Sequence, residues 1–187
     1  MTNPFDLSGK TALVTGGNGG IGQAIAVALA RAGADIAVAG RTPPDETRTL
    51  VEGLGRRFAA IPADLSGIAP IPALMEETVG TLGGLDILVN NAGLIRRDDP
   101  LDFTEADWDA VMDVNLKSVF FLCQAFGRYA LGNGRKGKII NIASMLSFQG
   151  GVRVPSYAAS KSGIAGITRL LANEWAGKGI NVNAIAP

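Results

Sequence analysis

The sequence predicts a three-layer α/β/α fold built on a doubly wound parallel sheet. Short apolar runs rich in Val and Ile alternate with longer segments of helical periodicity along the 187 residues, which is typical of successive βαβ units. Strands are expected over residues 10–15, 35–39, 58–62, 86–90, 138–143 and 180–185. Helices are expected over residues 20–32, 44–55, 67–81, 104–131 and 156–177. No repeat or linker interrupts the pattern, so residues 1–187 are expected to form one domain.

A glycine-rich loop joins the first expected strand to the first expected helix. It reads Thr-Gly-Gly-Asn-Gly-Gly-Ile-Gly over residues 15–22. Glycines permit a tight turn and a close approach of the backbone, and the free N–H groups at the start of the helix favour a pyrophosphate. A glycine-rich turn without a ligand is the alternative, but the position between strand and helix predicts a dinucleotide site of the Rossmann type.

The end of the second expected strand bears on the choice between NAD and NADP. This strand leads into Val-Ala-Gly-Arg-Thr, residues 38–42, without the acidic residue that usually binds the adenosine ribose. Asp35 stands at the start of the strand, at the wrong end to reach it. Arg41 could pair with a 2′-phosphate, so the sequence favours NADP, the alternative for Arg41 being a solvated loop arginine.

The last expected helix carries Tyr157 and Lys161, which are four positions apart. At this spacing both side chains leave one face of a helix about one turn apart. Ser156, after Pro155, is expected to cap the helix at its start. The apolar face repeats at Ile164, Ile167, Leu170 and Leu171, and Gly177 and Gly179 mark the end.

This pair predicts a proton-transfer site. A free phenol titrates near pH ~10, but a positive charge beside it favours the phenolate and makes it usable closer to neutral pH. Ser144 is expected at the end of a buried strand, where its hydroxyl could hydrogen-bond the substrate oxygen that exchanges a proton with Tyr157. Asn115 lies upstream and is the fourth candidate.

The composition excludes several other chemistries. The chain has no His and a single Cys, so a Ser-His-Asp triad, an imidazole zinc site and an internal disulfide are ruled out, and no metal is expected. Cys123 is expected to be a buried core thiol. The formal net charge of zero argues against nucleic acid as a partner, and no apolar run reaches the ~20 residues of a membrane span. We expect a cytoplasmic protein that acts on a small-molecule substrate.

With these motifs in place, the chain resembles the classical short-chain dehydrogenase/reductases over nearly its whole length. The glycine loop matches at Thr15, Gly16, Gly20 and Gly22, and further motifs match at Asp64-Leu65, at Asn90 to Gly93, and at Asn115, Ser144, Tyr157 and Lys161. The resemblance implies an NAD(P)-dependent oxidoreductase. It implies cofactor contacts from Gly16, Asn18, Gly20, Ile21, Gly22, Arg41, Asp64, Leu65, Asn90, Ala92, Gly93, Tyr157, Lys161 and Pro187.

The resemblance also assigns individual roles. Asp64 should bind the adenine amino group, the alternative being a carboxylate that only caps the following turn. Asn90, Ala92 and Gly93 should line the adenosine side of the cleft. Lys161 should orient the nicotinamide ribose as well as Tyr157. Asn115 should hold a water of the proton relay, the alternative being that it only satisfies a backbone group of a helix.

Within this family the wording of several segments is similar to the sugar-acid branch, the deoxygluconate and gluconate dehydrogenases. The segments are residues 90–97, 141–151, 153–157 and 172–176. A sugar acid needs a partner for its carboxylate, and Arg96, Arg97 and Arg153 follow strands at the edge where ligands bind in such sheets. Gln149 is a candidate for sugar hydroxyls, and Ser144 and Tyr157 should contact the reacting oxygen. Exposed loop arginines without a ligand are the alternative.

The resemblance further implies a homo-oligomer, a tetramer or a dimer, and a continuation beyond Pro187. Members of the family carry a mobile substrate loop, a further strand and helices there, and Pro187 begins the stretch that packs near the nicotinamide. Two other functions stay open: a dinucleotide-binding module with little or no turnover, and a reductase of another carbonyl substrate. A purely structural domain is disfavoured, because it would need neither the glycine loop nor the Tyr/Lys pair.

Overall fold

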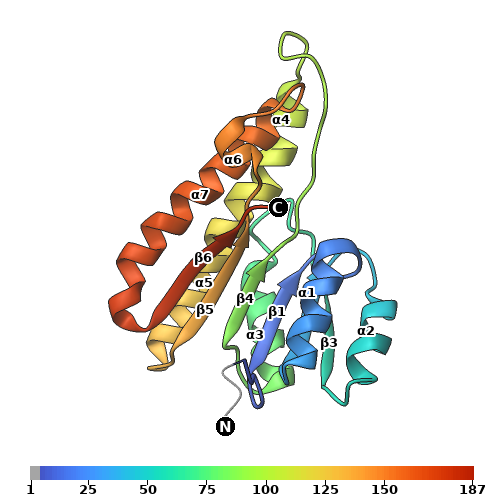
Figure 1. The fold of residues 1–187 in the computed structure, drawn as a ribbon, viewed down its shortest axis with the longest axis vertical. Coiled ribbons are helices and arrows are strands. Elements are labelled where there is room, and N and C mark those ends of the chain that lie inside the picture. Colours follow the sequence, from blue (N-terminus) through green and yellow to red (C-terminus); the bar gives the residue numbers. More distant parts are fainter. Residues whose placement is uncertain (1–4) are drawn as a thin grey trace.

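The computed structural model describes residues 5–187 as a parallel sheet of six strands flanked by helices (Figure 1). The strands follow the order β3-β2-β1-β4-β5-β6. They are β1 (Thr11–Thr15), β2 (Asp35–Gly40), β3 (Phe58–Pro62), β4 (Ile87–Asn90), β5 (Gly137–Ile142) and β6 (Ile180–Ile185). The order reverses between β1 and β4, so the carboxyl ends of these two strands flank the point where ligands bind in doubly wound sheets. The predicted fold class is confirmed.

Helices cover both faces of the sheet. On one face lie α1 (Gly20–Arg31) and α2 (Asp45–Glu52), and on the other lie α3 (Ile71–Leu82), α5 (Ser118–Gly132) and α7 (Pro155–Trp175). The remaining helical segments are α4 (Glu105–Met112), a π-helical turn at Asp113–Lys117, the short α6 (Leu146–Gln149) and a 3-10 turn at Ala176–Lys178. Each of the strands β1 to β5 is followed by a helix, because a connection between parallel strands needs a crossover.

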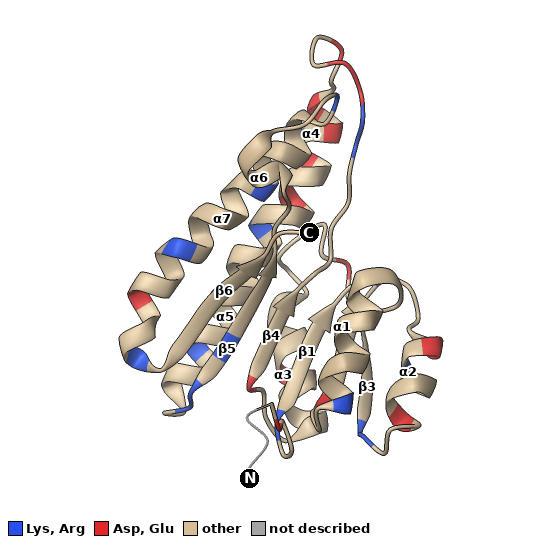
Figure 2. Ribbon diagram, in the orientation of Figure 1, with Lys and Arg blue, Asp and Glu red and all other residues tan. Residues whose placement is uncertain are grey.

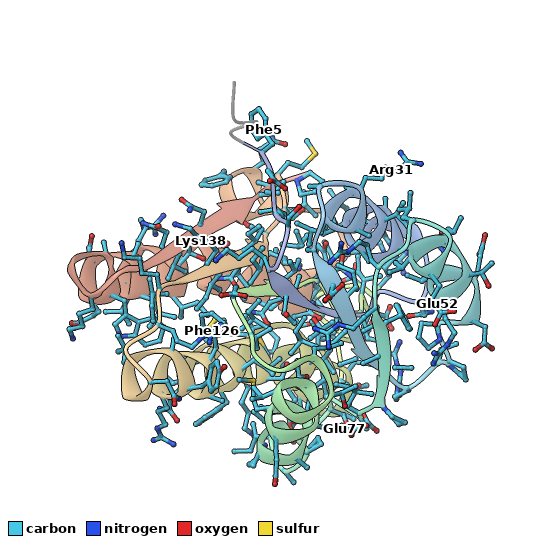
Figure 3. All side chains as sticks on the ribbon, turned by 90° about the horizontal axis from the view of Figure 1, so that it is seen from below. Phe5, Arg31, Glu52, Glu77, Phe126 and Lys138 are labelled. Carbon is cyan, nitrogen blue, oxygen red and sulfur yellow. The ribbon has the colours of Figure 1, made fainter. Side chains whose placement is uncertain are left out.

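The core consists of two apolar clusters, one on each face of the sheet. The larger one packs α3, α5 and α7 onto the strands, and Phe126 of α5 is fully buried in it (Figure 3). Cys123 lies in the same cluster, where burial raises the pKa of its thiol to about 12. The prediction of a buried core thiol is confirmed. β1 is buried at all five positions, as expected for a central parallel strand.

The last strand is covered on one face only within residues 5–187. Ile180 and Val182 of β6 are buried in the larger cluster, whereas Asn181 and Asn183 between them are exposed. This alternation follows from the period of two in a strand. In residues 5–187, no helix has the length and apolar character needed to cross a membrane.

Three expected helices differ from the structure. The segment 104–131 is divided, because five residues around Asn115 adopt a π-helical turn between α4 and α5. The segment 67–81 begins only at Ile71, after Pro70. The expected cap of the last helix is wrong: Val154 precedes the helix, Pro155 occupies its first turn, and Ser156 makes no capping bond. Proline is favoured in a first turn because its missing N–H is not needed there.

Candidate active site

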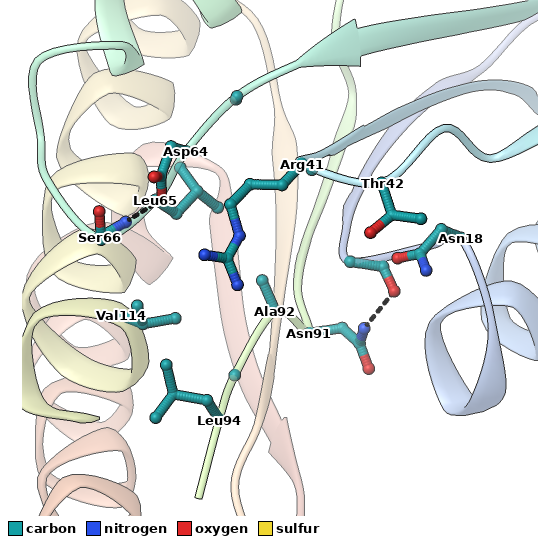
Figure 4. A pocket seen from close by; sticks show the side chains of 14 residues that line it. Asn18, Arg41, Thr42, Asp64, Leu65, Ser66, Asn91, Ala92, Leu94 and Val114 are labelled. Carbon is teal, nitrogen blue, oxygen red and sulfur yellow. Dashed lines mark hydrogen bonds between the residues drawn. The ribbon is translucent and has the colours of Figure 1, made fainter. Parts of the chain in front are cut away.

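The first of two adjoining pockets lies at the carboxyl ends of β1, β2, β3 and β4 (Figure 4). Its volume is about 240 Å³. It is lined by Gly16, Asn18, Gly40, Arg41, Thr42, Ala63, Asp64, Leu65, Ser66, Asn91, Ala92, Gly93, Leu94 and Val114. Seven predicted cofactor contacts, from four separate segments of the chain, are therefore brought together here. The pocket is the one that the glycine loop predicts.

The glycine loop is held by hydrogen bonds from the segment after β4. The Nδ2 of Asn91 donates to the carbonyl oxygens of Thr15 (2.9 Å) and Gly16 (3.1 Å). The hydroxyl of Thr15 in turn accepts from the backbone N–H groups of Asn91 and Ala92, both at 3.0 Å. The loop is thus fixed at the switch point before any ligand binds.

Glycine is required at two positions of this loop. Gly16 has a φ of +65°, and a Cβ there would lie 3.0 Å from the Cα of Ala92. A Cβ on Gly22 would lie 2.3 Å from the carbonyl oxygen of Gly16 and 2.4 Å from the Nδ2 of Asn91. These distances are shorter than van der Waals contact allows. Neighbouring atoms therefore already fill the space that a Cβ would need at Gly16 and Gly22. This close packing fits a pyrophosphate-binding loop.

We predict that Gly22→Ala destabilises the protein, although alanine normally favours a helix by roughly 1 kcal/mol. The added methyl group must displace backbone atoms of the loop, and such overpacking typically costs about 1–3 kcal/mol. A thermal melt without ligand measures the effect. Gly19→Ala is the matched control, since a Cβ there meets nothing within 4 Å. Equal melting temperatures for the two variants would contradict the close-packing argument.

Arg41 and Asp64 reach into the first pocket from the ends of β2 and β3 (Figure 4). The Asp64 carboxylate accepts a hydrogen bond from the backbone N–H of Ser66 at 3.0 Å. This bond lowers the pKa of Asp64, and the positive charge of Arg41 adds to the effect. Asp64 therefore caps the following turn, which was the alternative to a contact with adenine. Its exposed carboxylate still faces the pocket.

The second pocket adjoins the first and contains the Tyr/Lys pair. It has a volume of about 270 Å³. It is lined by Ile21, Asn91, Gly93, Leu94, Ile95, Ile142, Tyr157 and Lys161. Asn91, Gly93 and Leu94 line both pockets. The two pockets thus form one cleft that leads from Arg41 and Asp64 at one end to Tyr157 and Lys161 at the other.

Lys161 is buried beside Tyr157. Its side chain packs in α7 with the residue only 5% exposed, and its Nζ donates to the carbonyl oxygen of Ile142 at 2.5 Å. The same Nζ lies 5.7 Å from the centre of the Tyr157 ring, within cation–π range. Burial lowers the pKa of Lys161 from 10.5 to about 8. The geometry places a desolvated positive charge next to the phenol.

Asn115 lies in the π-helical turn and holds the loop after β4. Its Nδ2 donates to the carbonyl oxygen of Leu94 at 2.9 Å, and its Oδ1 accepts from the N–H of Leu94 at 2.8 Å. It also reaches the hydroxyl of Ser160 in α7 at 3.3 Å. Asn115 therefore satisfies backbone groups of a loop rather than of a helix, and it connects the wall of both pockets to α7.

Ser144 follows β5 and has a polarised hydroxyl. Its Oγ accepts a hydrogen bond from the backbone N–H of Leu146 at 3.2 Å. The hydroxyl hydrogen has no acceptor among residues 5–187, and the residue is 8% exposed. This leaves the O–H able to donate to a substrate oxygen.

Several predicted site residues lie outside the cleft. Asn90 is 3% exposed, and its Nδ2 donates to Asn141 and Cys123 in the interior. Asn91, and not Asn90, lines both pockets. Asn91, the second residue of the same Asn-Asn pair, was not among the expected cofactor contacts. Gly20 and Gly22 lie in the first turn of α1 and line neither pocket. Ile21, between them, lines the second pocket.

The substrate candidates lie on exposed loops. Arg96 is ion-paired with Asp107 at 3.0 Å, and Arg153 with Asp98 at 3.4 Å. Figure 2 shows acidic residues gathered on the projecting loop before α4 and on α4 itself, where these partners lie. Gln149 ends α6 and is exposed. None of the three lines either pocket. The carbonyl of Pro187 accepts from the N–H of Met145 at 2.9 Å, beside Ser144.

The cleft, with its glycine loop at one end and its Tyr/Lys pair at the other, can be compared with known proteins. Residues 10–187 match the family described as short chain dehydrogenase. The chain belongs to this family. The predicted family and the predicted class of activity, an oxidoreductase, are confirmed.

Several relatives of this short-chain dehydrogenase, at 46–60% identity, share one name. The chain is 60% identical over 187 residues to a 2-dehydro-3-deoxy-D-gluconate 5-dehydrogenase of Escherichia coli (strain K12), and covers 100% of itself and 74% of that relative. It is 53% identical over 191 residues to the protein of the same name in Bacillus subtilis (strain 168), of which it covers 73%.

Solved structures agree with this likeness. A proposed 2-deoxy-D-gluconate 3-dehydrogenase of Agrobacterium tumefaciens, with bound NADP, is 57% identical, with a TM-score of 0.93 over 100% of this chain and 74% of that one. A proposed NAD(P)-dependent gluconate 5-dehydrogenase of Beutenbergia cavernae, with NADP at low occupancy, is 45% identical, with a TM-score of 0.92 over 99% of this chain and 74% of that one.

Proposed function

We propose that this short-chain dehydrogenase transfers a hydride reversibly between NAD(P) and a secondary alcohol of a sugar acid, of the 2-deoxygluconate or 2-keto-3-deoxygluconate type. The observation that carries the proposal is the continuous cleft, which joins a glycine-loop pocket to a pocket containing Tyr157 and Lys161. The sugar-acid class is supported by the names of relatives at 53–60% identity. Residues 1–187 would then hold both the cofactor site and the catalytic groups.

In this proposal four residues move or hold the proton. Tyr157 is the general acid and base, and Lys161, whose Nζ lies 5.7 Å from the centre of the Tyr157 ring, stabilises its ionised form. Ser144 donates its free O–H to the substrate oxygen. Asn115 keeps the pocket wall at Leu94 in place, and a water held near it would extend the relay.

The cofactor supplies the hydride chemistry when it is bound. The loop of Gly16, Gly20 and Gly22 would hold its pyrophosphate at the start of α1, Asp64 its adenine, and Lys161 its nicotinamide ribose. Ala92 and Gly93 line the cleft between these ends. Pro187 lies beside Ser144 through Met145 and would close the nicotinamide end.

Arg41 would select NADP. Its guanidinium projects into the first pocket on the side of Asp64 and Ala92 (Figure 4), and two related structures contain NADP. A charge-assisted pair with a 2′-phosphate is worth roughly 1.5–3 kcal/mol, or about ten- to a hundredfold in affinity. We predict that Arg41→Asp lowers NADP affinity by about that factor and shifts the preference toward NAD.

Dissociation constants of both cofactors, measured by fluorescence titration in wild type and variant, test this prediction. Arg31→Ala is the control, because Arg31 is an exposed arginine at the far end of α1. Tighter binding of NAD than of NADP by the wild type would refute the assignment of Arg41.

The substrate carboxylate would be bound by Arg96 or Arg153, and sugar hydroxyls by Gln149. Both arginines already hold carboxylates in exposed ion pairs, which are weak. A substrate carboxylate could therefore replace Asp107 or Asp98 at little cost.

Cofactor reduction with a panel of sugar acids, beside a cofactor binding titration, tests the function. Turnover of 2-deoxygluconate or of 2-keto-3-deoxygluconate supports the proposal. Binding without turnover would instead favour a dinucleotide-binding module, and turnover only of other carbonyl compounds would favour a different substrate class.

Assembly and location complete the proposal. We propose a homo-oligomer, a tetramer or dimer, since Trp108 of α4 and Leu170 of α7 expose apolar surface, at 39% and 50%. We also propose a cytoplasmic location, where both nicotinamide cofactors are regenerated.

A further inference from the structure

Ser147 connects the two halves of the catalytic site. It lies in α6, the short helix that the sequence analysis did not predict. Its Oγ donates to the carbonyl oxygen of Lys161 in α7 at 2.8 Å. The same Oγ accepts from the backbone N–H of Ser144 at 3.2 Å. One hydroxyl thus bridges the backbone of Ser144 and the backbone of Lys161.

Further contacts make this bridge a rigid unit. The N–H of Ser147 donates to the carbonyl of Ser144 at 2.9 Å, and the hydroxyl of Ser162 donates to the carbonyl of Ser147 at 3.1 Å. The hydroxyl of Ser144 accepts from Leu146, as described above. Ser144 is therefore fixed at its N–H, its carbonyl and its Oγ, all through α6.

We propose that Ser147 is a positioning residue that sets the place of the Ser144 hydroxyl relative to Tyr157 and Lys161. The inference rests on the proposed function. Tyr157 and Lys161 leave one helix, so their relative position is fixed by α7 itself. Ser144 lies in a loop after β5 and has no such support. Ser147 supports the Ser144 loop by donating a hydrogen bond to the backbone of α7 at Lys161, the residue whose side chain lines the cleft.

Small displacements matter at such a site. Reacting groups must approach within about 3–3.5 Å, and a shift of about 1 Å can cost ~10²-fold in rate. Loss of the bridge would free the Ser144 loop without removing a group that contacts the cofactor. The effect should therefore fall on kcat and leave cofactor affinity unchanged.

The test compares three variants of the full chain. Ser147→Ala removes the bridging hydroxyl and should lower kcat about tenfold, with little change in KM, in the cofactor Kd or in melting temperature. Ser147→Thr keeps a hydroxyl and should restore kcat to within about threefold of wild type. Thr49→Ala removes an exposed hydroxyl that bonds only within α2, away from the cleft, and should behave as wild type. An unchanged kcat in Ser147→Ala would overturn the inference, as would equal losses in the Ala and Thr variants.

Amide hydrogen exchange at Ser144 provides a readout that needs no turnover. The Ser144 N–H should exchange faster in Ser147→Ala and keep its protection in Ser147→Thr. If the wild type turns over no sugar acid, the proposed function fails, and this measurement still decides the bridge. Unchanged protection of Ser144 in Ser147→Ala would then overturn it.

Discussion

Tyr157→Phe should lower kcat by about 10²–10⁴-fold, the usual contribution of a general acid–base group, while the dissociation constant of the cofactor stays nearly unchanged. The substitution removes only the phenolic hydroxyl, and with it the proton that is exchanged with the substrate oxygen. The ring that packs 5.7 Å from the Lys161 ammonium is retained. The loss should therefore appear in the chemical step and not in binding.

The chain offers a matched control, because it contains only two tyrosines. The hydroxyl of Tyr129 accepts from the N–H of Leu85 at 3.3 Å, away from both pockets of the cleft. Tyr129→Phe removes the same atom and should leave kcat within about twofold of wild type, since most substitutions distant from a site change little. Full activity of Tyr157→Phe under saturating cofactor and substrate would show that another group carries the proton.

The fold was predictable because a local run of apolar residues marks each strand in the sequence. The apolar runs that end at Thr15 and Asn90, for example, are the observed β1 and β4 to within one residue at either end. The break near Asn115 was not predictable. Asn115 in this π-helical turn makes two hydrogen bonds with Leu94, 21 positions earlier in the chain, and no local sequence pattern indicates such a contact.

Much of the candidate site was also predictable, since it follows from the ends of parallel strands meeting at one edge of the sheet. Arg41 was expected there from the end of its strand and Asp64 from the family resemblance, and both line the first pocket. The direction in which individual side chains point was harder to predict. Asn90 still belongs to β4 and faces the interior, whereas Asn91 lies just beyond the strand and faces the cleft. For Arg153, the sequence could not show that Asp98, 55 positions away, already pairs with it.

Lys161→Met should lower activity and yet raise the free energy of unfolding near neutral pH. In the proposed mechanism Lys161 both stabilises the ionised Tyr157 and holds the nicotinamide ribose, so kcat should fall and the cofactor Kd should rise together. Stability should respond in the opposite sense, because the native state keeps the ammonium in a buried place. Burial lowers the pKa of Lys161 to about 8, against an unfolded value near 10.5.

This difference fixes the pH dependence. Below pH ~8 the ammonium is charged in both states, and the native state bears the whole burial penalty, which a shift of this size puts at up to about 3 kcal/mol. Between pH ~8 and ~10.5 the native state loses the proton first, so the penalty fades as pH rises. Methionine bears no such penalty at any pH.

The free energy of unfolding of Lys161→Met, measured relative to wild type, should therefore be most favourable near pH 7 and decline through pH 8–10. Lys178→Met, which replaces an exposed ammonium at the far end of the sheet, should show no such trend. The lost bond from Nζ to the Ile142 carbonyl offsets part of the gain at every pH, so the slope with pH, rather than the value at one pH, is decisive. A stability difference that stays constant from pH 7 to pH 10 would mean that Lys161 is not desolvated, and its proposed action on Tyr157 from a dry pocket would lose its basis.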